Sequence, residues 1–243
     1  MIIPIYQPLG SSTHLLAQKL GKQVGEPTTH TGTLDPMAEG VIVCLTGEDR
    51  FQKQQHSDVI KEYRFIVLVG AKTDSHDLLG LPLVSGASVN ATIINDAMQK
   101  LTGSYEQIMP AFSAKRINGK SLFDAAKQNQ EVPEFKQQVT IHSLQMDGIA
   151  EITNKKLLSE IKARIKMVSG NFRQQEILSA WQEQLKNTTR FQLLDCVART
   201  SKRTYIRAIV RDLSEKLGAP LTTFHILRTK NGAYQIKDCT CLV

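Results

Sequence analysis

The spacing of apolar residues predicts three amphipathic helices along this chain. Ser12 and Asn90 each stand before such a run and suit a helix N-cap, whereas Gly103 and Gly218 follow runs and suit a helix end. Apolar side chains recur every three or four residues at Leu15, Leu16 and Leu20, at Ile93, Ile94, Ala97, Met98 and Leu101, and at Ile206, Ile209, Val210, Leu213 and Leu217.

Four short runs rich in aliphatic and aromatic residues predict β-strands at 41–45, 63–69, 139–144 and 191–197. Strands and helices are interspersed without a regular βαβ alternation. This order favours an α+β fold with a mixed or largely antiparallel central sheet flanked by helices.

Residues 153–189 have a different pattern, which predicts an inserted helical hairpin that packs on itself or on the body of the protein. Its two apolar faces contain Leu157, Leu158, Ile161, Ile165 and Val168 before Gly170, and Ile177, Leu178, Trp181 and Leu185 after it. The opposite face is basic, with Lys155, Lys156, Lys162, Arg164 and Lys166. Such a face is either solvated or an RNA-gripping arm, and solvation is the more common explanation.

Length and composition indicate a globular protein with a substantial core. The chain has 243 residues, of which 41% are hydrophobic and 22% charged, and we expect 1–243 to form a single domain. The net charge of +7 favours a polyanionic partner. No signal peptide and no apolar run of roughly 20 residues is present, so we expect a cytoplasmic protein without a membrane partner.

The heptapeptide from His30 to Pro36 contains the strongest candidate for catalysis. Gly32 and Pro36 restrict the backbone on either side of Asp35, just before a predicted strand. A carboxylate held in this way suits chemistry. The alternative is an Asx-type turn, in which the aspartate side chain only binds neighbouring backbone amides.

Six ordered motifs resemble those of the TruB-type tRNA pseudouridine-55 synthases. They span most of 1–152 and 190–236, and read His30-Thr-Gly-Thr-Leu-Asp-Pro36, Lys61-Glu-Tyr63, Thr73-Asp-Ser-His-Asp77 with Gly80, Pro110 to Lys120, Thr204-Tyr-Ile-Arg207, and Ile226-Leu-Arg-Thr-Lys-Asn-Gly232. The resemblance implies the pseudouridine synthase fold and a cofactor-free isomerase that converts uridine 55 in the tRNA T-loop to pseudouridine.

The resemblance also implies catalytic roles for three residues. Asp35 matches the aspartate that attacks the ribose or the base, so that the uracil detaches, rotates and rejoins through carbon 5. Arg207 matches the arginine that pairs with this aspartate; a guanidinium there favours the ionised carboxylate and orients it. Tyr63 matches the tyrosine that stacks on the base and is implicated in removing the proton from carbon 5.

Further residues are implied in substrate binding. The target uridine must be turned out of its stack, and His30 matches a residue that helps to fill the vacated space. Ile226 lines the pocket in the family, and Thr33 and Tyr205 are candidates within the same motifs. Three basic residues, Lys115, Arg116 and Lys120, are expected to contact phosphates. We expect the T-arm of tRNA as partner, no metal, no obligate protein partner, and a monomer.

Three departures from the family pattern stand out. Gln7 replaces a lysine near the N-terminal edge of the site, and Arg203 replaces a glycine before Thr204. Only seven residues follow Ile236, so we expect that the C-terminal RNA-binding PUA domain of many relatives is absent. A weaker grip on the acceptor stem would follow.

Other functions remain as alternatives. Residues 114–121 fit a relaxed P-loop pattern, but the segment before them has little strand character. A catalytically silent RNA-binding or chaperone protein, or a guide-dependent pseudouridylation subunit, would have the same fold. Asp74 and Asp77 are too few for a calcium or magnesium loop, and Cys239 with Cys241 falls short of a zinc site.

Overall fold

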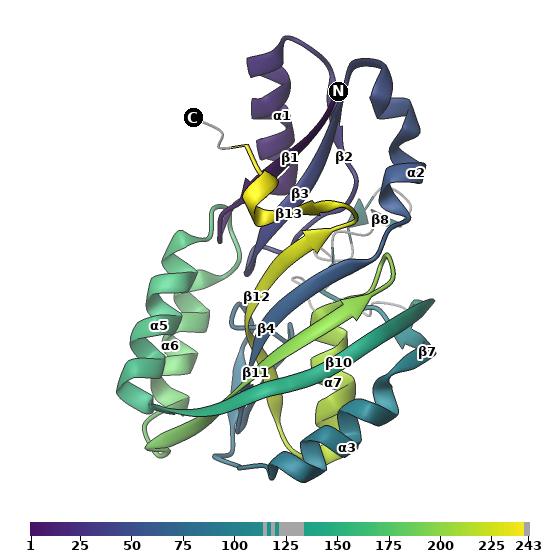
Figure 1. The fold of residues 1–243 in the computed structure, drawn as a ribbon. Coiled ribbons are helices and arrows are strands. Elements are labelled where there is room, and N and C mark those ends of the chain that lie inside the picture. The colour runs from purple at the N-terminus through teal and green to yellow at the C-terminus, as the bar shows by residue number, and fades with distance from the viewer. Residues whose placement is uncertain (114–115, 118–119, 122–133, 241–243) are drawn as a thin grey trace.

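The computed structural model describes residues 1–113, 116–117, 120–121 and 134–240 (Figure 1). The helices within them are α1 (Thr13–Val24), α2 (Lys53–Ser57), α3 (Ala91–Leu101), α5 (Asn154–Met167), α6 (Gln174–Gln184) and α7 (Ile206–Leu217), with short 3-10 turns at Gly47–Gln52 and Ile236–Asp238. The strands are β1 (Ile2–Gln7), β2 (Thr28–His30), β3 (Ala38–Thr46), β4 (Lys61–Val69), β5 (Ala71–Thr73), β6 (Pro82–Val84), β7 (Gly103–Ile108), β8 (Arg116–Ile117), β9 (Lys120–Ser121), β10 (Lys136–Thr153), β11 (Arg190–Thr200), β12 (Leu221–Asn231) and β13 (Tyr234–Gln235).

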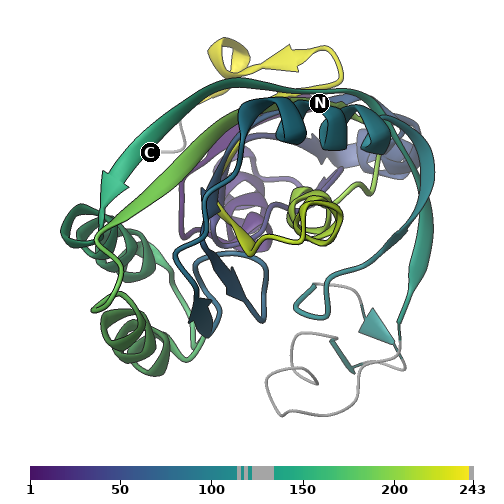
Figure 2. The ribbon, with the colours of Figure 1, turned by 90° about the horizontal axis from the view of Figure 1, so that it is seen from below.

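A mixed central sheet organises the described residues, in the order β1-β3-β12-β4-β11-β10-β7, with β2 beside β3 and β13 beside β12. Its pairs are antiparallel except that β3 and β12 run parallel. The sheet is curved, and α7 lies in its concave side next to β12 (Figure 2). The α+β fold class with a mixed, largely antiparallel sheet is confirmed.

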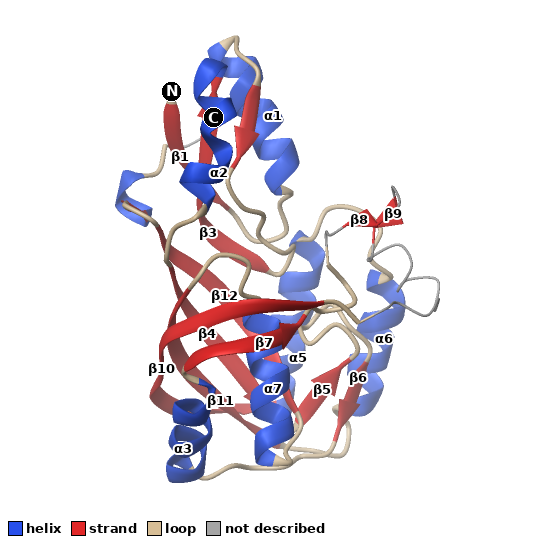
Figure 3. Cartoon of the chain, turned by 90° about the vertical axis from the view of Figure 1, so that its right-hand side faces the viewer, coloured by secondary structure: helices blue, strands red, loops and turns tan. Residues whose placement is uncertain are grey.

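The three predicted amphipathic helices are α1, α3 and α7, and their ends follow from the sequence. The Ser12 hydroxyl accepts a hydrogen bond from the Leu15 amide, and the Asn90 side chain accepts one from the Thr92 amide at 2.8 Å. Gly218 ends α7 in the left-handed conformation. Helices α3 and α7 pack against each other, and α7 also packs on β12. Figure 3 shows both helices in the lower part of the molecule.

Several strands were not predicted, above all β12, which lies in the middle of the sheet. Its sequence mixes Thr, His, Arg and Lys with apolar residues, and several of these polar side chains have partners inside the fold. The buried Arg228, for example, donates a hydrogen bond to the Val41 carbonyl. Pro4 within β1 and Pro8 just after it obscured that edge strand. Strand β10 extends to 18 residues, far beyond the predicted 139–144, and two register shifts against β11 bend it.

The predicted helical hairpin is present as α5 and α6, and it packs both on itself and on the body of the protein. Its apolar residues share a buried cluster with Met37, Leu78 and Leu79. The indole of Trp181 is fully buried and donates a hydrogen bond to the Leu78 carbonyl at 3.2 Å. The inserted hairpin therefore packs on the segment between β5 and β6 and shares a hydrophobic core with it.

Two further expectations concern cysteines and membranes. Cys44 and Cys196 are buried in the core, whereas Cys241 lies outside the described residues. Within the part of the chain that the structure describes, no helix is both long and apolar enough to cross a membrane.

Truncating Trp181 should loosen the hairpin. We expect Trp181→Ala to lower the free energy of unfolding by about 3–5 kcal/mol, because it removes a fully buried indole and leaves a cavity. Trp181→Phe should cost less, about 1–3 kcal/mol, through the lost partner of the Leu78 carbonyl. Urea denaturation measures both, with the exposed Gln182→Ala as control; a Trp181→Ala variant as stable as the wild type would contradict this packing.

Candidate active site

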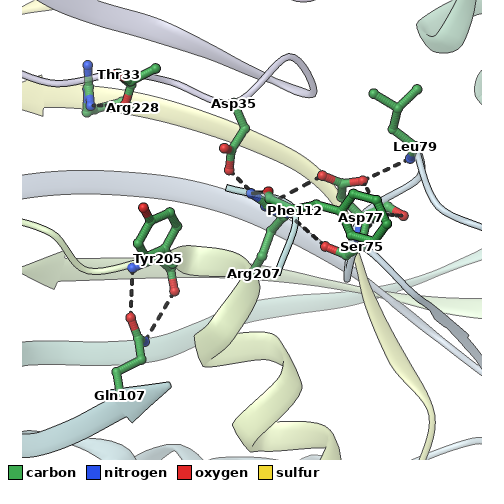
Figure 4. A network of polar contacts seen from close by, with 10 residues as sticks. All are labelled: Thr33, Asp35, Ser75, Asp77, Leu79, Gln107, Phe112, Tyr205, Arg207 and Arg228. Carbon is green, nitrogen blue, oxygen red and sulfur yellow. Dashed lines mark hydrogen bonds and ion pairs between the residues drawn. The ribbon is translucent and has the colours of Figure 1, made fainter. Parts of the chain in front are cut away.

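The structure joins Asp35 to Arg207 across 172 positions of sequence. Arg207 is the second residue of α7 and points its guanidinium at the loop before β3 (Figure 4). Its Nε donates a hydrogen bond to Oδ2 of Asp35 at 2.8 Å. The Asx-turn interpretation of Asp35 is wrong, because the carboxylate binds a guanidinium from another part of the chain.

The remaining donors of Arg207 also have partners. Its Nη1 donates to the Ser75 carbonyl and its Nη2 to the Phe112 carbonyl, each at 2.9 Å. A second carboxylate, that of Asp77, lies 3.5 Å from Nε. Asp77 is itself held by the Ser75 hydroxyl at 2.7 Å and the Leu79 amide at 2.9 Å. The guanidinium is thus fixed in one orientation by four groups from three segments.

Exposure distinguishes the two carboxylates. The Arg207 side chain is 2% exposed and that of Asp77 is 6% exposed, whereas the Asp35 side chain is 25% exposed. Of the two carboxylate oxygens of Asp35, only Oδ2 accepts a hydrogen bond from the described residues. Asp35 therefore has both a fixed anchor and an oxygen that a ligand can reach.

Burial and charge oppose each other at this cluster. Burial by itself would lower the pKa of Arg207, but the carboxylates of Asp35 and Asp77 outweigh it and hold that pKa above its ordinary value. Burial raises the pKa of Asp77, and Arg207 works against this rise. Two carboxyl groups share this one guanidinium, and Asp35 is the more exposed of the two.

A second buried arginine, Arg228, holds the loop that bears Asp35. From β12 it donates to the Val41 carbonyl at 2.7 Å, and more loosely to the Gly32 and Thr33 carbonyls. Gly40 allows β3 and β12 to approach closely, since a Cβ there would lie 2.2 Å from the Arg228 carbonyl oxygen. The parallel strand pair thereby fixes the loop.

Gln7, the first departure from the family pattern, is a buried structural residue. Its amide oxygen accepts a hydrogen bond from the Thr13 hydroxyl at 2.5 Å, and its amide nitrogen donates to the Ser11 carbonyl at 3.2 Å. The Thr13 hydroxyl in turn accepts from the Leu34 amide at 3.1 Å. A neutral glutamine at this position therefore supports the residue directly before Asp35.

Arg203, the second departure, has a backbone conformation that favours glycine. Its φ of +67° is left-handed, which is uncommon for a residue with a Cβ. Gln137 stabilises the turn by donating to the Arg203 carbonyl at 2.7 Å. The turn before α7 is thus kept, and the exposed arginine side chain is added to it.

Tyr205 is held at the start of α7 through its backbone. The buried side chain of Gln107 accepts from the Tyr205 amide at 2.9 Å and donates to its carbonyl at 3.3 Å (Figure 4). Burial raises the pKa of the Tyr205 hydroxyl, and Asp35 raises it further, so the neutral phenol is favoured beside the carboxylate.

The other predicted site residues lie on β2, β4, β12 and the loop that bears Asp35. Tyr63 on β4 is 7% exposed and Ile226 on β12 is 3% exposed, and both belong to the same apolar cluster as Leu34 and Ile206, the neighbours of Asp35 and Arg207. Thr33 is exposed on the loop. His30 on β2 is partly buried, and burial lowers its pKa to about 4, with a smaller contribution from Lys53.

Not every predicted contact is tested. Lys115 lies outside the described residues, and for Arg116 and Lys120 only the β8–β9 pairing of the backbone is described. Half of the P-loop-like segment 114–121 lies outside as well. No group of three or more His, Cys, Asp or Glu side chains in the described ranges is placed to hold a metal ion.

The sequence motifs did not assign roles to several residues that shape the site. Asp77 was considered only as a metal ligand, yet it is the second partner of Arg207. Gln107 clamps Tyr205, and Arg228 anchors the loop. The signal that could have revealed Arg228 was an arginine directly after the apolar pair Ile226-Leu227.

Comparisons with known proteins agree with this geometry. A family model described as TruB family pseudouridylate synthase (N terminal domain) matches residues 21–173. The chain belongs to this TruB family. A protein of Listeria welshimeri named tRNA pseudouridine synthase B is 30% identical over 99% of this chain and 69% of its own length. The protein of that name in Bacillus cereus is 29% identical over 98% of this chain and 68% of its own length.

Solved structures show the same fold. The Cbf5-Nop10-Gar1 complex contains a chain that matches 96% of this TruB-family chain with a TM-score of 0.59 at 15% identity. An H/ACA RNP bound to a substrate RNA containing 2'-deoxyuridine gives a TM-score of 0.56. The chain spans about half the length of these two proteins, at 49% and 48%.

His76 lies inside the catalytic cluster between Ser75 and Asp77. It has a left-handed φ of +62°, and its amide donates to the Thr73 carbonyl. Burial lowers its pKa from 6.5 to about 4, and the cations of Arg207 and Arg211 act in the same direction. The folded protein therefore keeps this imidazole neutral at pH values where the unfolded chain binds a proton.

Acid should destabilise the protein in the window between these two pKa values. As the pH falls from 6.5 to 4, protonation of His76 in the unfolded chain should lower the free energy of unfolding by up to about 3 kcal/mol, with a further decrease from His30. Asparagine tolerates the left-handed backbone, so His76→Asn should flatten this pH dependence. Urea melts across the window test it; the exposed His142→Asn is the control, and identical slopes for wild type and His76→Asn would contradict the assignment.

Proposed function

We propose that this chain converts uridine to pseudouridine in tRNA, at position 55 of the T-loop, as an isomerase without a cofactor. The observation that carries the proposal is the Asp35 carboxylate, which is partly exposed and bound at 2.8 Å by a buried guanidinium. Membership of the TruB family and the names of the relatives support the substrate class.

Asp35 attacks the ribose or the base after the target uridine has left its stack. The bond between N1 of uracil and C1' of the ribose breaks, the uracil rotates, and a bond between C5 and C1' forms. The bond that Asp35 made in its attack breaks again, so the free carboxylate is regenerated. The proton on C5 is then lost and N1 regains one, so that the product is an isomer. Arg207 orients Asp35, and its own hydrogen bonds to the Ser75 and Phe112 carbonyls keep the guanidinium from moving during the reaction.

Tyr63 stacks on the flipped uracil and takes part in removal of the C5 proton. Ile226 supplies an apolar wall, while Thr33, Tyr205 and His30 contact the nucleotide and the space that it vacates. Stacking of a base on an aromatic ring stabilises binding by about 1–3 kcal/mol, which offsets part of the cost of base flipping. Lys115, Arg116 and Lys120 bind phosphates in this proposal, and the enzyme acts in the cytoplasm as a monomer without protein partners.

Release of label from carbon 5 tests the reaction directly. Purified protein is incubated with T-arm RNA that bears tritium at C5 of uracil, and the released tritium is counted. We expect multiple turnovers without guide RNA, partner subunits or added cofactor. Tight binding without release would identify a silent RNA-binding protein, and release only with a guide RNA would identify a guide-dependent subunit.

Two substitutions test the roles of Asp35 and Arg207. We expect Asp35→Asn to abolish release, because the amide is no nucleophile. We expect Arg207→Lys to bind RNA but to lose at least about 100-fold in turnover, about 2.7 kcal/mol, since lysine cannot supply the planar set of donors to Asp35, Ser75 and Phe112. Normal turnover by Arg207→Lys would refute the pairing role, and circular dichroism controls for folding.

A further inference from the structure

The turn of the inserted hairpin, residues 168–173, lies against the catalytic cluster. The Ser169 amide and hydroxyl donate to the Gly10 carbonyl at 3.1 and 3.0 Å, and the Gly10 amide donates to the carbonyl of Pro36, next to Asp35. The approach is close, since a Cβ on Gly10 would lie 2.1 Å from the Met167 carbonyl oxygen. The hairpin is thus fixed relative to the loop that bears Asp35.

Arg173 makes a second attachment from the same turn. Its guanidinium binds the Asp74 carboxylate at 3.0 Å and lies over the Phe112 ring, 5.3 Å from the ring centroid. Asp74 and Phe112 belong to the two segments whose carbonyls bind Arg207. Gln174 closes the turn by bonding to the Val168 and Gly170 carbonyls. The surface next to this turn therefore has a defined position beside the active site.

An open groove of about 550 Å³ lies between the end of α5 and the start of α6, at this turn. Its floor is apolar, with Ile165, Val168 and Leu178. Lys162 and Lys166 line one wall, and Gln175, Ser179 and Gln182 line the other. None of the residues that line the groove is acidic, so the groove offers cations, amides and a hydroxyl.

The charge of this groove is not compensated within the described part of the protein. The segment 153–189 contains seven Lys and Arg against three Glu, more than half of the chain's net charge of +7. Arg164, Arg173 and Lys186 have carboxylate partners at Glu160, Asp74 and Glu183. Lys162 and Lys166 have none among the described residues, and they are exposed four residues apart on α5, where like charges repel.

We propose that this hairpin groove, lined by Lys162, Lys166, Gln175, Ser179 and Gln182, binds the phosphate backbone of the RNA substrate. The inference rests on the proposed function, because an RNA delivered to Asp35 brings phosphates past the adjoining turn. An anion between the two lysines relieves their repulsion, and the amides and the hydroxyl donate to phosphate oxygens. The hairpin and the β8–β9 pair lie on either side of α7 on the concave face of the sheet (Figure 2). The RNA would thus be bound from the hairpin side in addition to the side of β8 and β9.

Filter binding of unmodified tRNA over a range of salt concentrations tests the groove without requiring turnover. We expect Lys162→Gln with Lys166→Gln to weaken binding about tenfold at 0.1 M salt and to reduce the slope of log K against log salt by up to about 2. The matched control is Lys100→Gln with Lys216→Gln, an exposed pair at the far ends of α3 and α7 that removes the same charge. Lys162→Arg with Lys166→Arg should keep the affinity, and thermal melting should show all variants folded.

The outcomes separate this inference from the proposed function. If the groove variant binds tRNA as tightly and with the same salt slope as the wild type, or if the control pair weakens binding equally, the groove is no RNA contact, whatever the turnover. If the groove variant alone weakens binding while the wild type releases no tritium, the contact stands and the proposed reaction fails.

Discussion

The structure depends on a buried guanidinium that has to satisfy several groups at once. Arg207 is 2% exposed, and such a charge is costly to bury unless all of its donors are paired. Asp77 and two backbone carbonyls pair most of it permanently. The Nε–H of the guanidinium points to Asp35. The need to pair this donor therefore also holds the Asp35 carboxylate in place at the surface of the site.

Two arginines from the C-terminal third of the chain act on one short N-terminal loop. Arg207 binds the side chain of Asp35, and Arg228 binds the backbone of Gly32 and Thr33. Thr13, supported by Gln7, holds the Leu34 amide from a third side. The loop is thus positioned by α1, α7 and β12 together, and the inserted hairpin supports the same arrangement through Gly10 and Asp74.

Sequence patterns predicted the features that depend on residues close together in the chain. Cap residues and apolar periodicity indicated α1, α3 and α7, and the resemblance to the TruB family implied the pairing of Asp35 with Arg207, which the structure shows. The central strand β12 was missed because several of its polar side chains find their partners only at residues distant in sequence. Asp77 and Arg228 were missed for the same reason, since a buried charge cannot be recognised before its partner is known. Arg203 shows the opposite case: the family pattern has a glycine there, and this chain places an arginine in a left-handed backbone conformation.

The parallel pairing of β3 with β12 has a consequence for how the protein matures. Ile226 and Ala38 are neighbours in the sheet although almost the whole chain separates them, and such non-local contacts form late because loop closure precedes them. During synthesis on the ribosome, the backbone of the N-terminal loop can therefore be bound by Arg228 only after β12 has emerged. Catalytic competence then arises in the final stage of folding, together with closure of the sheet.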